Sequence, residues 1–305
     1  MGHGLALLFA LGGHAVRLTD SDAKTLERAG TLMQSALATL RDAGEASASW
    51  TGQRLSAAVR RCGTLAETLE GADVVIEAIV EQLDAKRRLF TEIDAIGDER
   101  MILASNTSYL NVFPLIPERR QQRALIAHWY TPPYLVDLVD LVSGPKTEAA
   151  VVERMRATVV ALGQVPIVLN RFIPGYIANR IQSAITLEVN RLLDEGYATP
   201  REIDDAIIHG LALRMPILGH LAKADFTGLN LTRQVLANKM YGPPPVRGRS
   251  ETLDLLVEEG HIGVRSGRGY FAWGARDPSD LFRERDKRLL ALKRALREIG
   301  PLTGE

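Results

Sequence analysis

The first 170 residues alternate between two hydrophobic patterns. Apolar side chains recur at helical spacing over residues 4–11, 83–96 and 148–162. Between these stretches lie short apolar runs, which predict β-strands at residues 15–19, 74–76, 101–104, 124–129, 136–142 and 166–169. Helices and strands in alternation are typical of a mostly parallel sheet with helices on its faces.

Two segments of this region differ from the rest. Residues 22–61 are polar with helical spacing, and they predict a long helical segment that is broken near Gly44 and Ser47. Residues 74–76 are wholly apolar, with an acidic residue on each side, which favours a strand buried on both faces of the sheet.

Beyond Asn170 the pattern predicts helices only. Thr199 is followed by Pro200 and, three positions after Thr199, by Glu202, which predicts a capped helix start. A proline-rich loop follows at residues 241–245, and a helix rich in both acids and bases ends the chain. We therefore expect two domains, an α/β domain over residues 1–170 and an all-α domain over residues 171–305.

Composition and charge narrow the classes of partner. The chain is 46% hydrophobic and 24% charged, and its 37 basic side chains equal its 37 acidic ones. Such a balance provides no overall field for nucleic acid or for an anionic membrane, so we expect neither as a partner. Cys62 is the single cysteine and cannot form an internal disulfide, which favours a cytoplasmic location. The apolar opening stretch is too short to span a bilayer and lacks the features of a signal peptide.

The start of the chain carries part of a dinucleotide-binding pattern. In such folds a strand leads into G-x-G-x-x-G, the next helix points its amino end at the pyrophosphate, and an acid about 20 residues on binds the adenine ribose. Here the helix is predicted at residues 4–11, and Asp20 follows the next strand. A carboxylate at that position would repel a 2′-phosphate. The sequence therefore predicts NAD rather than NADP.

The first strand and the first two glycines of that pattern are missing. Gly2 is then the last glycine of a truncated fingerprint, or simply the second residue of a disordered start. The missing strand would be central in the order 3-2-1-4-5-6. Burial of its four or five apolar side chains would contribute roughly 6–15 kcal/mol, comparable to the whole stability of a typical protein. We expect codons upstream of Met1 to encode it, and a stop codon directly before Met1 would refute this.

Six short strings carry a resemblance to a known family. They are MGHG at residues 1–4, IEAIVEQLDAK at 76–86, ASNTS at 104–108, HWYTPP at 128–133, PGYIANR at 174–180 and SGRGYF at 266–271. In order and spacing they resemble the 3-hydroxyacyl-CoA dehydrogenases over essentially the whole chain. The resemblance implies a Rossmann domain followed by a helical domain, a homodimer, and NAD-linked oxidation of an L-3-hydroxyacyl-CoA in fatty acid metabolism.

The resemblance also assigns catalytic roles. His128 would be the base that takes the proton of the 3-hydroxyl, and Asp140, twelve residues on, would be its partner carboxylate. An acid on the second imidazole nitrogen fixes the tautomer and stabilises the charged ring. Ser108 and Asn179 would lie beside the substrate oxygen, Ser108 also near the nicotinamide. Without the flanking strings, a structural histidine, a turn serine and a buried helix asparagine would be the alternatives.

Further positions match cofactor contacts of the family. Glu81 and Lys86 would contact NAD, although a helix-start charge and a solvent-facing lysine are the alternatives. Arg265 stands where many members have a lysine close to the cofactor. Thr131 replaces the asparagine that usually follows the catalytic histidine by three residues, so a hydroxyl would replace that amide contact. The family uses no metal, and we predict no metal site.

Substrate identity stays open at this stage. Asp140 is one methylene shorter than the usual glutamate, and residues 22–61 lack a dense lysine cluster for the phosphates of CoA. The basic residues in that segment are Lys24, Arg28, Arg41, Arg54, Arg60 and Arg61. Related branches oxidise free hydroxy acids, among them the L-gulonate 3-dehydrogenases related to lambda-crystallin, whose turn resembles residues 131–134, and bacterial pyridine-carboxylate dehydrogenases. A free 3-hydroxy acid, or a non-catalytic structural role, is therefore the alternative.

Overall fold

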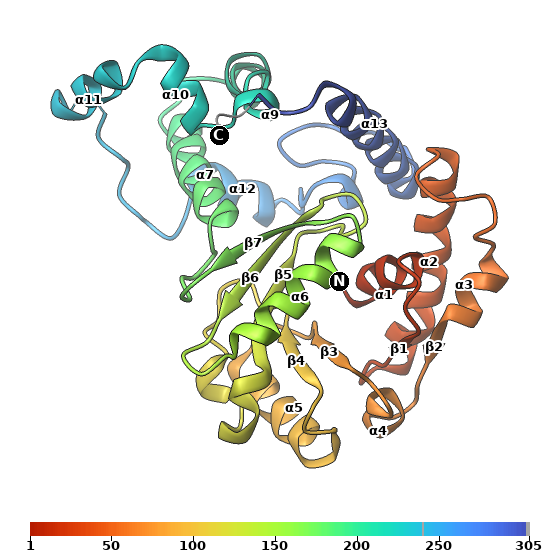
Figure 1. Cartoon of the computed structure of the whole chain (residues 1–305). Coiled ribbons are helices and arrows are strands. Elements are labelled where there is room, and N and C mark those ends of the chain that lie inside the picture. Colours follow the sequence, from red (N-terminus) through yellow and green to blue (C-terminus); the bar gives the residue numbers. More distant parts are fainter. Residues whose placement is uncertain (240, 303–305) are drawn as a thin grey trace. The chain divides into compact units, whose positions relative to one another are not determined.

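The computed structural model describes residues 1–239 and 241–302, which form two compact units (Figure 1). The first unit is Met1–Arg180 and the second is Ile181–Glu305. Among the described residues, no helix combines the length and the apolar character needed to cross a membrane.

A five-stranded sheet forms the centre of the first unit. Its strands, in spatial order, are β3 (Val74–Glu77), β4 (Ile102–Ser105), β5 (Ala124–Trp129), β6 (Leu138–Ser143) and β7 (Val165–Leu169). The first three strands are parallel, and β6 runs antiparallel to β5. A short turn with a cis Thr131–Pro132 peptide joins β5 to β6. The sheet confirms the predicted α/β class.

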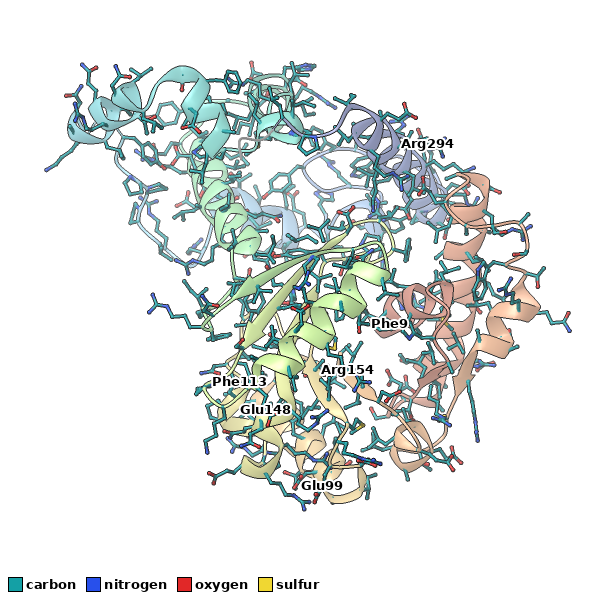
Figure 2. All side chains as sticks on the ribbon, in the orientation of Figure 1. Phe9, Glu99, Phe113, Glu148, Arg154 and Arg294 are labelled. Atoms are coloured by element: carbon teal, nitrogen blue, oxygen red, sulfur yellow. The ribbon has the colours of Figure 1, made fainter. Side chains whose placement is uncertain are left out.

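Helices cover both faces of this sheet, because successive strand residues point to opposite faces and both sets are apolar. On one face α1 (Gly2–Leu11) and α6 (Ala149–Ala161) pack on β4, β5 and β6. Phe9 of α1, labelled in Figure 2, has its ring centroid 5.8 Å from that of Trp129. On the other face α5 (Leu83–Ile96) packs through Phe90 and Ile93. Ile126, two residues before His128, belongs to this second cluster, so His128 lies on the α5 face.

A separate two-stranded parallel sheet contains β1 (Val16–Leu18) and β2 (Val59–Arg61). Between and after these strands come three helices, α2 (Ala23–Asp42), α3 (Gly52–Ala58) and α4 (Leu65–Leu69). The helix expected over residues 22–61 is therefore wrong at its end. Val59 is buried and pairs with Val16, and a three-residue run is too short to show a strand period. Among the described strands, β1 pairs only with β2, and β3 pairs only with β4.

The second unit is helical, as predicted. Its elements, with α7 beginning in the first unit, are α7 (Ala178–Asp194), α8 (Pro200–Asp205), the π-helix η3 (Ala206–Ala212), α9 (Met215–Leu218), α10 (Leu221–Thr227), α11 (Leu229–Ala237), α12 (Glu251–Glu258), the 3-10 helix η4 (Val264–Ser266) and α13 (Pro278–Ile299). The capping box of Thr199 and Glu202 is present at the start of α8. Two further 3-10 helices lie in the first unit, η1 (Phe113–Leu115) and η2 (Glu118–Arg123).

Candidate active site

The structure brings His128 and Asp140 together. The two residues are opposite each other in the antiparallel register of β5 and β6, and both side chains are on the α5 face of the sheet. His128 Nδ1 lies 3.2 Å from Asp140 Oδ2. The two residues are only 3% and 1% exposed. A buried carboxylate next to Nδ1 fixes that nitrogen as the donor and leaves Nε2 able to accept a proton.

The second nitrogen of His128 faces a polar loop. Ser108, in the loop after β4, places its Oγ 3.1 Å from His128 Nε2. Two aromatic rings enclose the imidazole, with Tyr130 at 4.6 Å and Tyr176 at 5.0 Å between centroids. Tyr176 donates a hydrogen bond of 2.6 Å to the carbonyl of Thr107, and this bond connects the Tyr176 ring to the loop that carries Ser108. The arrangement can take a proton from a hydroxyl placed beside Ser108.

Tyr130 also reaches the carboxylate, which sequence reasoning missed. Its hydroxyl donates a hydrogen bond of 2.8 Å to Asp140 Oδ2 and accepts one from the backbone N–H of Asn179. Burial, and then the hydrogen bond to Asp140, raise the pKa of Tyr130 above its usual range. The signal was available in the sequence, because residues two apart in an extended segment share a face.

A second buried charge cluster stands at the ends of β3 and β4. Lys86 Nζ lies 2.7 Å from Glu77 Oε1 and 3.2 Å from Glu81 Oε2. Ser105 Oγ donates to the other oxygen of Glu77 at 2.6 Å. Lys86 is 1% exposed, so the alternative of a solvent-facing lysine is wrong. Its ammonium faces two carboxylates, and the predicted direct contact with NAD receives no support from this geometry.

Glu81 supports the loop that carries Ser108. One of its oxygens accepts hydrogen bonds from the Thr107 hydroxyl at 2.7 Å, from the Ser108 N–H at 2.9 Å and from the Tyr109 N–H at 3.0 Å. Burial alone would raise the pKa of Glu81, but these bonds and the Lys86 ammonium outweigh it and lower the pKa to about 2. Glu81 is therefore ionised at neutral pH, and its contact with NAD stays a prediction.

Three of the predicted cofactor residues, Gly2, Asp20 and Thr131, belong to the segments around the amino end of α1. Gly2 begins this helix and lies beside Leu18 at the end of β1, and Asp20 follows that strand with an exposed carboxylate. Thr131 Oγ1 lies 2.9 Å from the sulfur of Met1. A side chain at Gly4 would come within 2.8 Å of Pro133, so glycine permits the close approach of helix and turn.

This region fits a dinucleotide. No side chain caps the amino end of α1, so its first backbone N–H groups can bind a pyrophosphate. The contact of Asp20 with the ribose hydroxyls stays a prediction. Arg265 lies in η4 of the second unit, and its predicted role stays a prediction. Among the described residues, no group of three or more His, Cys, Asp or Glu could hold a metal ion.

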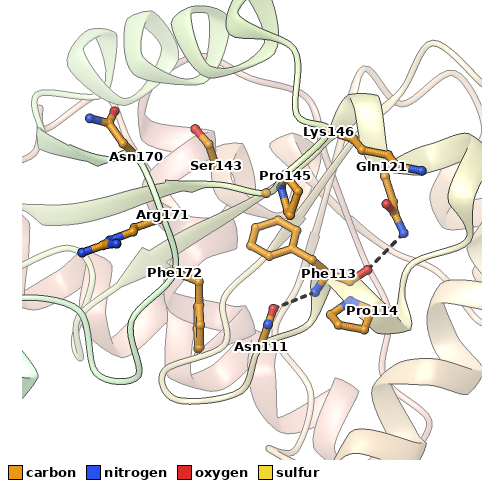
Figure 3. A pocket seen from close by; sticks show the side chains of 11 residues that line it. Asn111, Phe113, Pro114, Gln121, Ser143, Pro145, Lys146, Asn170, Arg171 and Phe172 are labelled. Atoms are coloured by element: carbon orange, nitrogen blue, oxygen red, sulfur yellow. Dashed lines mark hydrogen bonds between the residues drawn. The ribbon is translucent and has the colours of Figure 1, made fainter.

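A separate pocket of about 410 Å³ lies at the opposite edge of the sheet, where β6 and β7 end (Figure 3). Phe113 forms one wall, its N–H donating to Asn111 and its carbonyl accepting from Gln121. Ser143, the last residue of β6, and Asn170, directly after β7, also line the pocket. Of the residues described, those that line this pocket include no predicted site residue, so the pocket is distinct from the His128 site.

Comparisons with known proteins identify the family of this chain. Residues 1–172 match the family model described as 3-hydroxyacyl-CoA dehydrogenase, NAD binding domain, and residues 175–273 match that of the C-terminal domain. Lambda-crystallin of Oryctolagus cuniculus is 33% identical over 72% of this chain and 70% of its own length. L-carnitine dehydrogenase of Nocardiopsis dassonvillei is 34% identical over 79% of this chain and 73% of its own length. A solved structure of 5-formyl-3-hydroxy-2-methylpyridine 4-carboxylic acid 5-dehydrogenase, an NAD+-dependent dismutase, superimposes with a TM-score of 0.85 at 26% identity, over 99% of this chain and 96% of that one.

Proposed function

The chain belongs to the 3-hydroxyacyl-CoA dehydrogenase family and is an NAD-dependent oxidoreductase that acts on CH–OH groups, and on this premise we propose that His128 and Asp140 catalyse the reversible oxidation of a 3-hydroxyl to a 3-oxo group. One observation carries the proposal. The imidazole has its Nδ1 held 3.2 Å from a buried carboxylate, while its Nε2 faces the Ser108 hydroxyl.

Each residue has a defined part in this proposal. His128 Nε2 accepts the proton of the substrate hydroxyl, and Asp140 stabilises the resulting imidazolium. Ser108 and Asn179 orient the substrate oxygen. The amino end of α1, with Gly2, Asp20 and Thr131 around it, would hold NAD, which supplies the hydride acceptor when bound.

The family membership supports an L-3-hydroxyacyl-CoA as substrate. A free hydroxy acid is the second candidate, and a specific observation favours it. The relative that superimposes with a TM-score of 0.85 is named for a pyridine carboxylate, and another relative is named for L-carnitine. Neither name contains CoA. The segment with α2 and α3 also lacks a dense lysine cluster that would suit the CoA phosphates.

An NADH absorbance assay separates the two candidates. The purified chain is given NAD with 3-hydroxybutyryl-CoA, free 3-hydroxybutyrate or L-gulonate in parallel. NADH formation with the thioester alone supports the CoA substrate, and formation with a free acid alone supports the second candidate. Absence of NADH formation from all three, in a chain that enhances NADH fluorescence on binding, would contradict a 3-hydroxy substrate.

Assembly and domain roles complete the proposal. The resemblance implies a homodimer through apolar helix faces. The change of sequence pattern places a domain boundary near Asn170, which would separate the cofactor part from the substrate part. Exposed apolar side chains of the second unit support such an interface, among them Ile181, Ile185, Ile208, Leu211, Leu229 and Val257. Sedimentation at several protein concentrations tests it, and a monomer at all of them would contradict it.

A further inference from the structure

The carboxylate of Asp140 has two donors on one oxygen. Oδ2 lies 3.2 Å from His128 Nδ1 and accepts the Tyr130 hydroxyl at 2.8 Å. The other oxygen, Oδ1, is buried and has no hydrogen-bond partner among the described residues. A buried carboxylate in this state depends on each donor that it has, because water does not replace a lost one.

Tyr130 is held from both sides. Its ring meets the imidazole of His128 edge to face, and its hydroxyl accepts the backbone N–H of Asn179 near the start of α7. The phenol therefore bridges the start of α7 and Asp140. This chain of contacts runs from Asn179 through Tyr130 and Asp140 to His128, entirely within the first unit.

We propose that Tyr130 is a positioning residue of the His128–Asp140 pair, and that its hydroxyl sets how strongly the carboxylate holds a proton on the imidazole. This rests on the proposed function of that pair. A donor on Oδ2 withdraws negative charge from the oxygen that faces Nδ1. With the phenol present, the carboxylate stabilises the imidazolium less than it would without this donor.

Removal of the hydroxyl reverses this balance. In Tyr130→Phe the imidazole is left as the donor to Asp140, so the protonated ring is favoured. Oxidation needs the neutral ring, and the acidic limb of activity must therefore move to higher pH. The variant leaves the other titratable side chains around the site in place. They are Asp140 on β6, Glu77 at the end of β3, Glu81 after β3, Tyr109 after β4 and Tyr176 before α7.

The test is the pH profile of kcat/KM for oxidation with the best substrate of the assay above. We expect the acidic limb of Tyr130→Phe to move up by roughly half to one pH unit, and kcat at pH 7 to fall about 3–10-fold, with the KM for NAD unchanged. Tyr241→Phe is the matched control, because it removes a hydroxyl that donates to Glu188 at 2.9 Å in the second unit. Its profile should equal the wild type.

A second readout does not depend on turnover. The NMR titration of the His128 ring in labelled protein should show the same upward shift in Tyr130→Phe, and Asp140→Asn should abolish the difference between tyrosine and phenylalanine at position 130. An unmoved His128 titration overturns this proposal. So does a uniform loss of kcat at every pH together with a lower Tm, which a merely structural role would give. Full turnover in His128→Gln instead overturns the proposed function.

Discussion

Two buried charge clusters stand at the same edge of the five-stranded sheet, and they differ in how completely their carboxylates are bonded. In the first, Glu77 accepts from Lys86, Ser105 and a backbone N–H, and Glu81 accepts from four loop donors and pairs with Lys86. In the second, Asp140 has both donors on Oδ2, and Oδ1 has none among the described residues.

This difference indicates that the first cluster supports the structure and that the second takes part in proton transfer. A fully bonded cluster fixes the position of the backbone around it, and here it fixes the loop that carries Ser108. In the second cluster the carboxylate accepts only from the imidazole and the phenol, so it acts on the catalytic base rather than on a loop. Changes in the first cluster should therefore lower stability, and changes in the second should lower activity.

The largest effect is expected at His128. His128→Gln keeps a side chain of similar size but removes the base, so kcat should fall by about 10²–10⁴-fold while NADH affinity changes little. Steady-state kinetics and NADH fluorescence titration measure the two quantities. His14→Gln, at an exposed position before β1, is the control and should match the wild type. A His128 variant with full turnover would remove this residue from its role.

The next effect is expected at Lys86. Lys86→Met leaves two carboxylates close together without their buried ammonium, and the free energy of unfolding should fall by about 3–5 kcal/mol. Lys146→Met is the matched control, because it breaks an ion pair with Glu118 that is largely exposed, and it should cost no more than about 1 kcal/mol. Urea denaturation measures both variants. Equal losses would contradict the supporting role of the cluster.

In contrast to Lys86→Met, a change of Asp140 should lower activity much more than stability. Asp140→Asn removes a buried charge that is incompletely bonded, so the free energy of unfolding should stay within about 1 kcal/mol of the wild type. The activity should fall, by about 10–10³-fold, because the imidazolium loses its stabilising charge. Thermal unfolding and kcat are measured on the same preparation. A large loss of stability with activity retained would place Asp140 in the supporting class instead.

The smallest effect is expected for Glu81, and it depends on pH. The pKa of Glu81 in the folded chain is about 2, below its usual value of 4.5. Its stabilising contribution is therefore complete above pH 4.5 and is lost as the pH falls towards 2. Glu81→Gln should flatten this part of the curve of stability against pH. Glu92→Gln, at an exposed position of α5, is the control and should keep the wild-type slope.

Much of the fold was predictable from the sequence, because it rests on local patterns. Short apolar runs predicted β3 to β7, and the capping box predicted the start of α8. Strand β2 was not predictable, since Val59–Arg61 is too short to show a period and forms a strand only where β1 lies beside it. Tyr130 was missed for a different reason, because its place on the same face as His128 could be predicted but the acceptor of its hydroxyl could not. Its importance depends on where Asp140 and Asn179 meet it, and neither is its neighbour in the chain.

Local sequence patterns were enough to predict the alternating class of the first unit and the helical class of the second, and the family resemblance identified His128 and Asp140, whose side chains meet. Strand period, helix period and capping depend on residues that are close together in the sequence, so they can be recognised without the structure. Only the folded chain shows that Lys86 is buried against two acids rather than facing solvent, and that a phenol shares the carboxylate with the imidazole. Those properties depend on burial and on distances between separate strands, and only the folded chain sets them.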